Sequence, residues 1–145
     1  MNRLHFAFAV LLFSLHSFSE VQHSPADRTL NHNRATAIIF QDLQNYPDIL
    51  QQVRLLPADE VMAASIVSNF VRQFLEYGKD VDAGQLTLIE FFHLRDYLVE
   101  STLAQLQHAL SREGWTKFDR FVRTRSDRQL IMHPPVNAGL IRTSL

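Results

Sequence analysis

Residues 57–77 read PADEVMAASIVSNFVRQFLEY, and this stretch decides the fold class. Pro57 suits the first position of a helix, and Asp59 and Glu60 follow in the first turn, where the helix dipole favours negative charge. Apolar residues then recur at steps of three and four, with polar residues between them. This spacing predicts a strongly amphipathic helix that ends at Gly78. The apolar positions are Ala63, Ile66, Val67, Phe70, Val71, Phe74 and Leu75.

Shorter helices are predicted before this stretch. Helical spacing of apolar residues begins near Thr36 and stops before Pro47, which disfavours the helical conformation of the residue that precedes it. Pro47 itself suits the first position of a second short helix, over residues 47–53. Residues 20–34 are polar and include Pro25, so we expect a flexible leader there.

Two longer helices are predicted after it. Thr87 and Glu90 have the spacing of a capping box, which opens a helix that runs to about Leu110. The first half of this helix is apolar on nearly all sides, so we expect it to lie at the centre of the molecule. Ser111 predicts the N-cap of a last helix with helical apolar spacing. The apolar residues of that helix are Trp115, Phe118, Phe121 and Val122.

These elements predict an all-α, single-domain bundle of four or five helices over residues 35–128. No alternating strand pattern or internal repeat occurs, and the connections are short. We expect residues 129–145 to form an extended or loose C-terminal tail, because Pro134 and Pro135 end regular structure there.

The first nineteen residues have the pattern of a signal peptide. Arg3 gives a basic start, residues 4–15 are almost wholly apolar, and Ser17 and Ser19 provide a small-x-small cleavage site. The apolar stretch is too short for a bilayer that needs about 20 residues. We therefore expect residues 1–19 to be cleaved, which leaves no membrane span in an exported, periplasmic or extracellular protein. Retention of the stretch as an anchor is the alternative.

Composition excludes several classes of function. The chain of 145 residues has no cysteine, which removes disulfide scaffolds, cysteine-ligated zinc and thiol nucleophiles. Its four glycines include no phosphate-binding loop, and no nucleophile-elbow or zinc-protease string occurs. The 14 basic and 15 acidic residues are too balanced for a general nucleic-acid binder. We expect a binding or interaction module without a cofactor rather than an enzyme or a nucleic-acid-binding protein.

A carboxylate ridge on the predicted central helix is a candidate metal site. Glu90, His93, Asp96 and Glu100 follow one another at steps of three, three and four, so their side chains project from one side of the helix. The Glu-x-x-His pair is the one that di-iron carboxylate bundles use, although this chain has no second pair. The alternative is a ridge that is solvated or faced by arginine, from Arg72, Arg120 or Arg123 on a neighbouring helix.

Charge is segregated along the chain. Residues 42–100 hold ten acidic and four basic residues (net −6), and residues 101–128 hold three acidic and six basic residues (net +3). Either the last helix lies across the acidic part and the two neutralise each other, or its cations form a strip for phosphate headgroups or an acidic partner. The expected partner is thus a protein or an envelope component. The candidate contacts are Arg112, Lys117, Arg120 and Arg123.

The closing helix carries one resemblance. Residues 110–122 read LSREGWTKFDRFV, with Ser111 at the cap and Trp115, Phe118 and Phe121 at helical spacing. Near the end of a helical chain with a signal-like start, this segment resembles the closing helix of small secreted bacterial proteins of unknown function. The resemblance implies export and an all-helical fold, and it implies no activity and no site.

Overall fold

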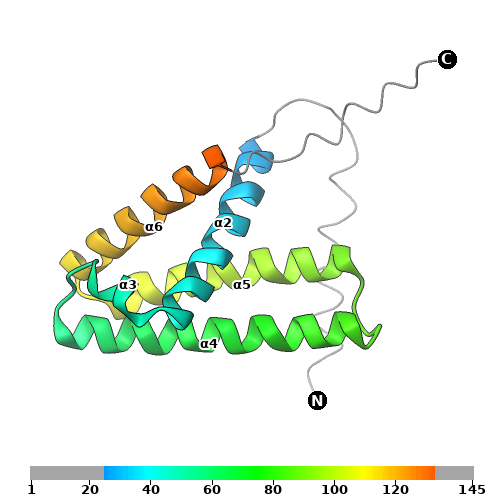
Figure 1. Ribbon diagram of the computed structural model, residues 1–145, viewed down its shortest axis with the longest axis horizontal. Helices are drawn as coiled ribbons and strands as arrows, with labels where there is room; N and C mark the ends of the chain where they lie inside the picture. The colour runs from blue at the N-terminus through cyan, green and yellow to red at the C-terminus, as the bar shows by residue number, and fades with distance from the viewer. Residues whose placement is uncertain (1–24, 133–145) are drawn as a thin grey trace.

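The computed structural model describes residues 25–132, and these form an all-helical domain (Figure 1). No strand occurs among them. The expected signal peptide and the residues that follow it to position 24 lie outside this part, as do residues 133–145 of the expected tail. The helices are α2 (Pro25–Asn45), α3 (Pro47–Gln51), α4 (Pro57–Asp82), α5 (Leu88–Ala109) and α6 (Arg112–Met132).

Several helix starts follow the local sequence signals. Pro47 and Pro57 lie in the first turns of α3 and α4, as the sequence predicts. The capping box of α5 is formed as well. The Thr87 hydroxyl accepts the backbone N–H of Glu90, and the Glu90 carboxylate accepts the backbone N–H of Thr87 at 2.8 Å. Short-range chemistry therefore fixes where these helices begin.

Three helix bounds differ from the sequence expectation, and each helix is longer. The expected leader is helical from Pro25 onward, and Asn33 within it is buried against α5 through a hydrogen bond to Glu100. α4 does not end at Gly78 but continues to Asp82, and the turn glycine is Gly84, with φ of +68°. α6 likewise includes the segment up to Met132 that was expected to be extended.

The centre of the domain is α2. The helices α4 and α5 form a long antiparallel hairpin, α2 crosses one face of it, and α6 packs beside α2 (Figure 1). α2 contacts α3, α4, α5 and α6, whereas α5 touches α6 only slightly. The prediction that α5 is the central helix was wrong, because the first turns of α5 leave several large apolar side chains exposed.

Aromatic side chains connect α2 to its neighbours. The Phe40 ring on α2 lies 5.0 Å from the Phe70 ring on α4 and 6.4 Å from the Phe118 ring on α6. All three rings are at most 1% exposed. Phe40 of α2 therefore packs in the core against aromatic rings of both α4 and α6. Around these rings pack buried aliphatic residues that include Ile39, Leu43, Ala63, Val67, Val99, Leu106 and Val122.

A polar contact fixes the start of α6 against α4. The Ser111 hydroxyl accepts the backbone N–H of Gly114 at 3.0 Å, which confirms the predicted cap. The same hydroxyl donates to the Asp59 carboxylate, which also accepts the Ser111 backbone N–H at 2.9 Å. These hydrogen bonds hold the pKa of Asp59 below its usual value, with a smaller contribution from the Lys117 charge, although burial acts the other way.

Because the charged form of Asp59 is the one that binds Ser111, we expect the stabilisation to depend on pH. The folded-state pKa lies below the unfolded value of about 3.9, so this stabilisation is complete above that value and is lost as the pH falls through the folded-state pKa. Asp59→Asn should lower the free energy of unfolding at about pH 7 and have less effect at about pH 3. Urea unfolding of both proteins measures the difference, and an equal difference at both pH values would contradict a role for the charge.

Candidate functional site

Three of the four residues of the expected carboxylate ridge have hydrogen-bond partners outside the ridge. Glu90 is used by the capping box, and its hydrogen bonds with Thr87 lower its pKa. Glu100 accepts the side-chain amide of Asn33 at 3.1 Å, and His93 is exposed. Among residues 25–132, no group of three or more His, Asp or Glu side chains is placed to hold a metal ion. The geometry therefore gives the metal alternative no support.

Asp96 of this ridge is buried beside an arginine of its own helix. The Arg95 guanidinium donates to one Asp96 carboxylate oxygen from two nitrogens, at 2.9 and 2.7 Å, and lies 5.1 Å above the centre of the Phe92 ring. Burial raises the pKa of Asp96, and the hydrogen bonds and charge of Arg95 oppose that rise. The arginine that pairs with the ridge, at Asp96, is thus Arg95 of the same helix rather than one from a neighbouring helix.

Each acidic residue of α6 has a partner, and the arginines that remain unpaired by described carboxylates make one side of the helix basic. Asp119 pairs with Arg123 at 2.8 Å, and Glu113 pairs with Lys117 at 2.7 Å. Asp127, the remaining acidic residue of α6, lies 3.8 Å from His32 on α2. Within residues 25–132, no carboxylate lies within 4.0 Å of the cationic groups of the other arginines of α6. These are Arg112, Arg120, Arg125 and Arg128.

The position of α6 explains why its charge is not neutralised. α6 packs chiefly on α2, not across the acidic part of the chain. In the part of the chain that the structure describes, no ion pair joins α6 to residues 42–100. Lys117 acts electrostatically on Asp59 of the acidic part, but no ion pair among the described residues neutralises the other arginines of α6 from there.

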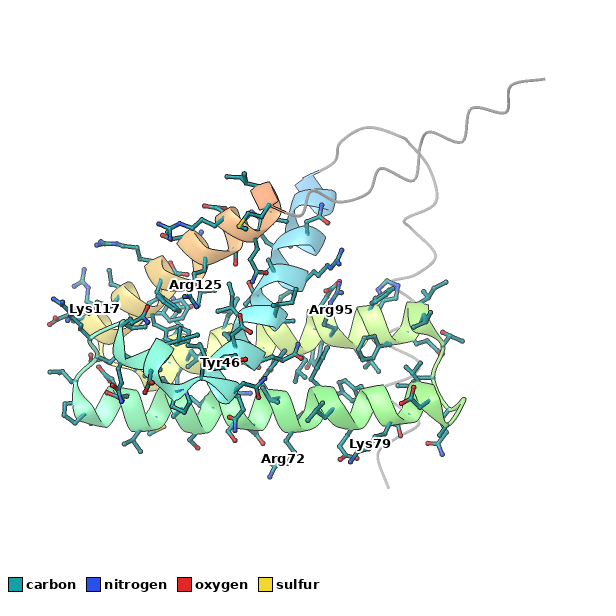
Figure 2. All side chains as sticks on the ribbon, viewed as in Figure 1. Tyr46, Arg72, Lys79, Arg95, Lys117 and Arg125 are labelled. Atoms are coloured by element: carbon teal, nitrogen blue, oxygen red, sulfur yellow. The ribbon has the colours of Figure 1, made fainter. Side chains whose placement is uncertain are left out.

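Cationic side chains of α6 line an open hollow of about 430 Å³ beside the end of α3. We call this hollow the basic groove. Phe121 contributes an aromatic surface to it, and the Arg125 guanidinium lies 5.1 Å from the centre of that ring. Figure 2 shows Lys117 and Arg125 on the side of α6 next to α3. The lining residues are Gln52, Val53, Lys117, Arg120, Phe121, Thr124, Arg125 and Arg128.

The basic groove continues along α6 and is tied to the loop before α4. A second open hollow of about 520 Å³ is lined by Arg112, Glu113 and Thr116 together with Lys117 and Arg120, which border both hollows. The Lys117 ammonium also donates to the backbone carbonyl of Arg54 at 3.2 Å. Because two cations border both hollows, the positive charge is continuous from Arg112 to Arg128, over more than four turns of α6.

Sequence reasoning found part of this groove. Of the four expected partner contacts, Lys117 and Arg120 line it and Arg112 lines the adjoining hollow, whereas Arg123 lines neither and pairs with Asp119. The residues that it missed include Arg125 and Arg128. The steps of four, four and three from Lys117 through Phe121 and Arg125 to Arg128 place these side chains on one flank of a helix. That spacing is the signal that could have found them.

The groove suits anionic groups with several oxygens. Guanidinium groups donate two parallel hydrogen bonds to phosphate or carboxylate, and a cation beside an aromatic face is partly desolvated, which strengthens its interaction with an anion.

The chain matches no protein-family model, and none of the curated proteins or solved structures with which it was compared matches it. None of the helices over residues 25–132 is both long and apolar enough to cross a bilayer.

Proposed function

We propose that this protein is an exported helical binding module that holds phosphate groups of an envelope component in the basic groove of α6. One observation carries the proposal: Arg120, Arg125 and Arg128 line one hollow and have no carboxylate within ion-pair distance among the described residues. Uncompensated arginines placed together repel one another, so an anion in the groove relieves that repulsion.

The choice of phosphate over other anions rests on the donors. Three of the four cations in the groove are arginines, whose planar forks fit phosphate bidentately, and the fourth, Lys117, supplies a point charge. The net charge of the whole chain is −1, so the attraction is a local property of the groove. Local positive charge on a nearly neutral protein favours docking at an anionic surface in one orientation.

Export is the second part of the proposal, and it rests on the N-terminal sequence. A basic start, an apolar stretch over residues 4–15 and a small-x-small site at Ser17 and Ser19 are the features of a secretory signal. An N-terminus at Glu20, read by mass spectrometry on protein recovered outside the cytoplasm, supports cleavage. Recovery of that protein with Met1 intact contradicts it.

The binding test uses vesicles that differ only in charge. We expect the protein to co-sediment with phosphatidylglycerol vesicles and not with phosphatidylcholine vesicles. Arg120 and Arg128 are exposed and unpaired by any described carboxylate, so Arg120→Glu/Arg128→Glu should weaken binding at least about tenfold while the fold is retained. Binding of the wild type should also weaken as salt is added.

A matched control separates the groove from overall charge. Arg72→Glu/Lys79→Glu makes the same charge change on α4, along the edge away from α6 (Figure 2). This variant should bind nearly as the wild type does. Equal loss in both variants would contradict a specific groove, and tighter binding of polyglutamate than of the anionic vesicles would contradict phosphate as the ligand.

A further inference from the structure

A row of phenylalanine rings runs from the core of the domain out to its surface. The Phe70 ring, which packs against α2, lies 5.7 Å from Phe74, which lies 5.3 Å from Phe91, which in turn lies 5.8 Å from Phe92. Exposure increases along this row, from 1% at Phe70 to 46% at Phe92. The apolar packing that α2 covers at one end thus continues past α2, where no other helix of residues 25–132 covers it.

The uncovered part is the end of the α4–α5 hairpin. Figure 1 shows this end extending beyond α2 and α6, next to the turn that joins the two helices. Exposed large apolar side chains gather on it. We define the arm patch as Leu75, Leu88, Ile89 and Phe92, which are 54%, 61%, 69% and 46% exposed.

The charge around the arm patch argues against a membrane as its cover. Residues 71–97 hold three basic residues, Arg72, Lys79 and Arg95, against five acidic ones, which gives a net charge of −2. Anionic lipid surfaces attract segments with an excess of lysine and arginine, and this segment has no such excess. The nearly balanced charge allows two copies of the same surface to approach each other.

Geometry and area favour a second copy of the chain. The hairpin end consists of two antiparallel helices that both expose apolar side chains, Leu75 on α4 and the other three on α5. Two such ends packed together make a four-helix bundle. The exposed side chains of the patch and the half-buried rings beside them offer roughly 600 Å² per copy, so a dimer would bury roughly 1,200 Å², at the lower end of stable interfaces. Because α2 packs on both helices behind this end of the hairpin, an antiparallel overlap of the two ends keeps the rest of each copy apart, at opposite ends of the bundle.

We propose that the arm patch is a self-association surface, through which two copies of this chain pair their hairpin ends into an antiparallel four-helix bundle. This inference is independent of the basic groove, which lies on α6 beside α3.

Sedimentation equilibrium of the wild type and one variant tests the proposal. Ile89 lies in the first turn of α5, where a negative charge is favourable to the helix, so Ile89→Glu should leave the monomer folded. In the dimer, the same carboxylate would be buried among apolar side chains without a partner. We expect a dimer mass for the wild type at about 50 μM and a dissociation constant raised about 100-fold or more by Ile89→Glu.

The control variant is Val61→Glu, which places the same charge at a residue of α4 that is 72% exposed and lies outside the patch. It should leave the dimer intact, and far-ultraviolet circular dichroism should show the same helix content in all three proteins. A monomeric wild type at that concentration would overturn the proposal. Equal dissociation by the two variants, or an Ile89→Glu protein that remains a dimer, would overturn it as well.

Discussion

Phe40→Ala is expected to lower the free energy of unfolding by about 3–5 kcal/mol, which is the usual cost of removing a fully buried aromatic ring. Phe40 has no exposed surface, and its ring packs against both Phe70 on α4 and Phe118 on α6. Its loss therefore leaves a cavity where three helices meet. Urea denaturation followed by far-ultraviolet circular dichroism measures the change.

Ile38→Ala is the matched control on the same helix. Ile38 is 38% exposed, so truncation removes less buried surface and should cost less than about 1.5 kcal/mol. Equal destabilisation by the two variants would contradict the position of Phe40 at the centre of the core.

Gly114→Ala is expected to destabilise the protein by about 2 kcal/mol or more. A Cβ atom built on Gly114 would lie 2.2 Å from an Asp59 carboxylate oxygen and 2.7 Å from its Cγ. The carboxylate must then move, and its hydrogen bonds to Ser111 at the start of α6 are lost or distorted. Thermal or urea unfolding of the variant measures the loss.

Gly78→Ala is the control, and we expect it to stabilise the protein. Gly78 lies inside α4, and a Cβ atom there meets nothing within 4 Å. Alanine favours the helix over glycine, so this variant should gain about 0.5–1 kcal/mol of stability. Stabilisation by both substitutions would contradict the close approach of α6 to Asp59.

Helix positions were predictable where the signals are local. The apolar spacing after Pro57, the capping box at Thr87 and Glu90, and the cap at Ser111 each act within one or two turns, and the structure confirms them. The polar first half of α2 instead packs through distant contacts, such as that between Asn33 and Glu100. No local pattern encodes such contacts, so from the sequence alone this polar segment indicates a leader.

The first turns of α5 show a second limit of sequence patterns. A helix that is apolar on most sides is expected to be buried, yet Leu88, Ile89 and Phe92 are exposed at the end of the hairpin. The pattern indicates that these side chains favour an apolar environment. It does not indicate whether they are buried by the same chain or, as we propose, by a second copy.

The candidate groove was partly predictable for a similar reason. Its basic character follows from the excess of arginine and lysine in α6, which is visible in the sequence. Which cations line it depends on the position of α3 beside α6, which brings Gln52 and Val53 next to Arg125 and Arg128.

The central claim is that anionic groups bind in the basic groove, and an NMR titration of the protein with soluble polyphosphate tests it most directly. We predict that the backbone and arginine side-chain signals that change lie within residues 117–128 of α6 and at Gln52 and Val53. Changes centred on α4 and α5 would contradict the account. So would spectra in which the groove signals are visible and do not change.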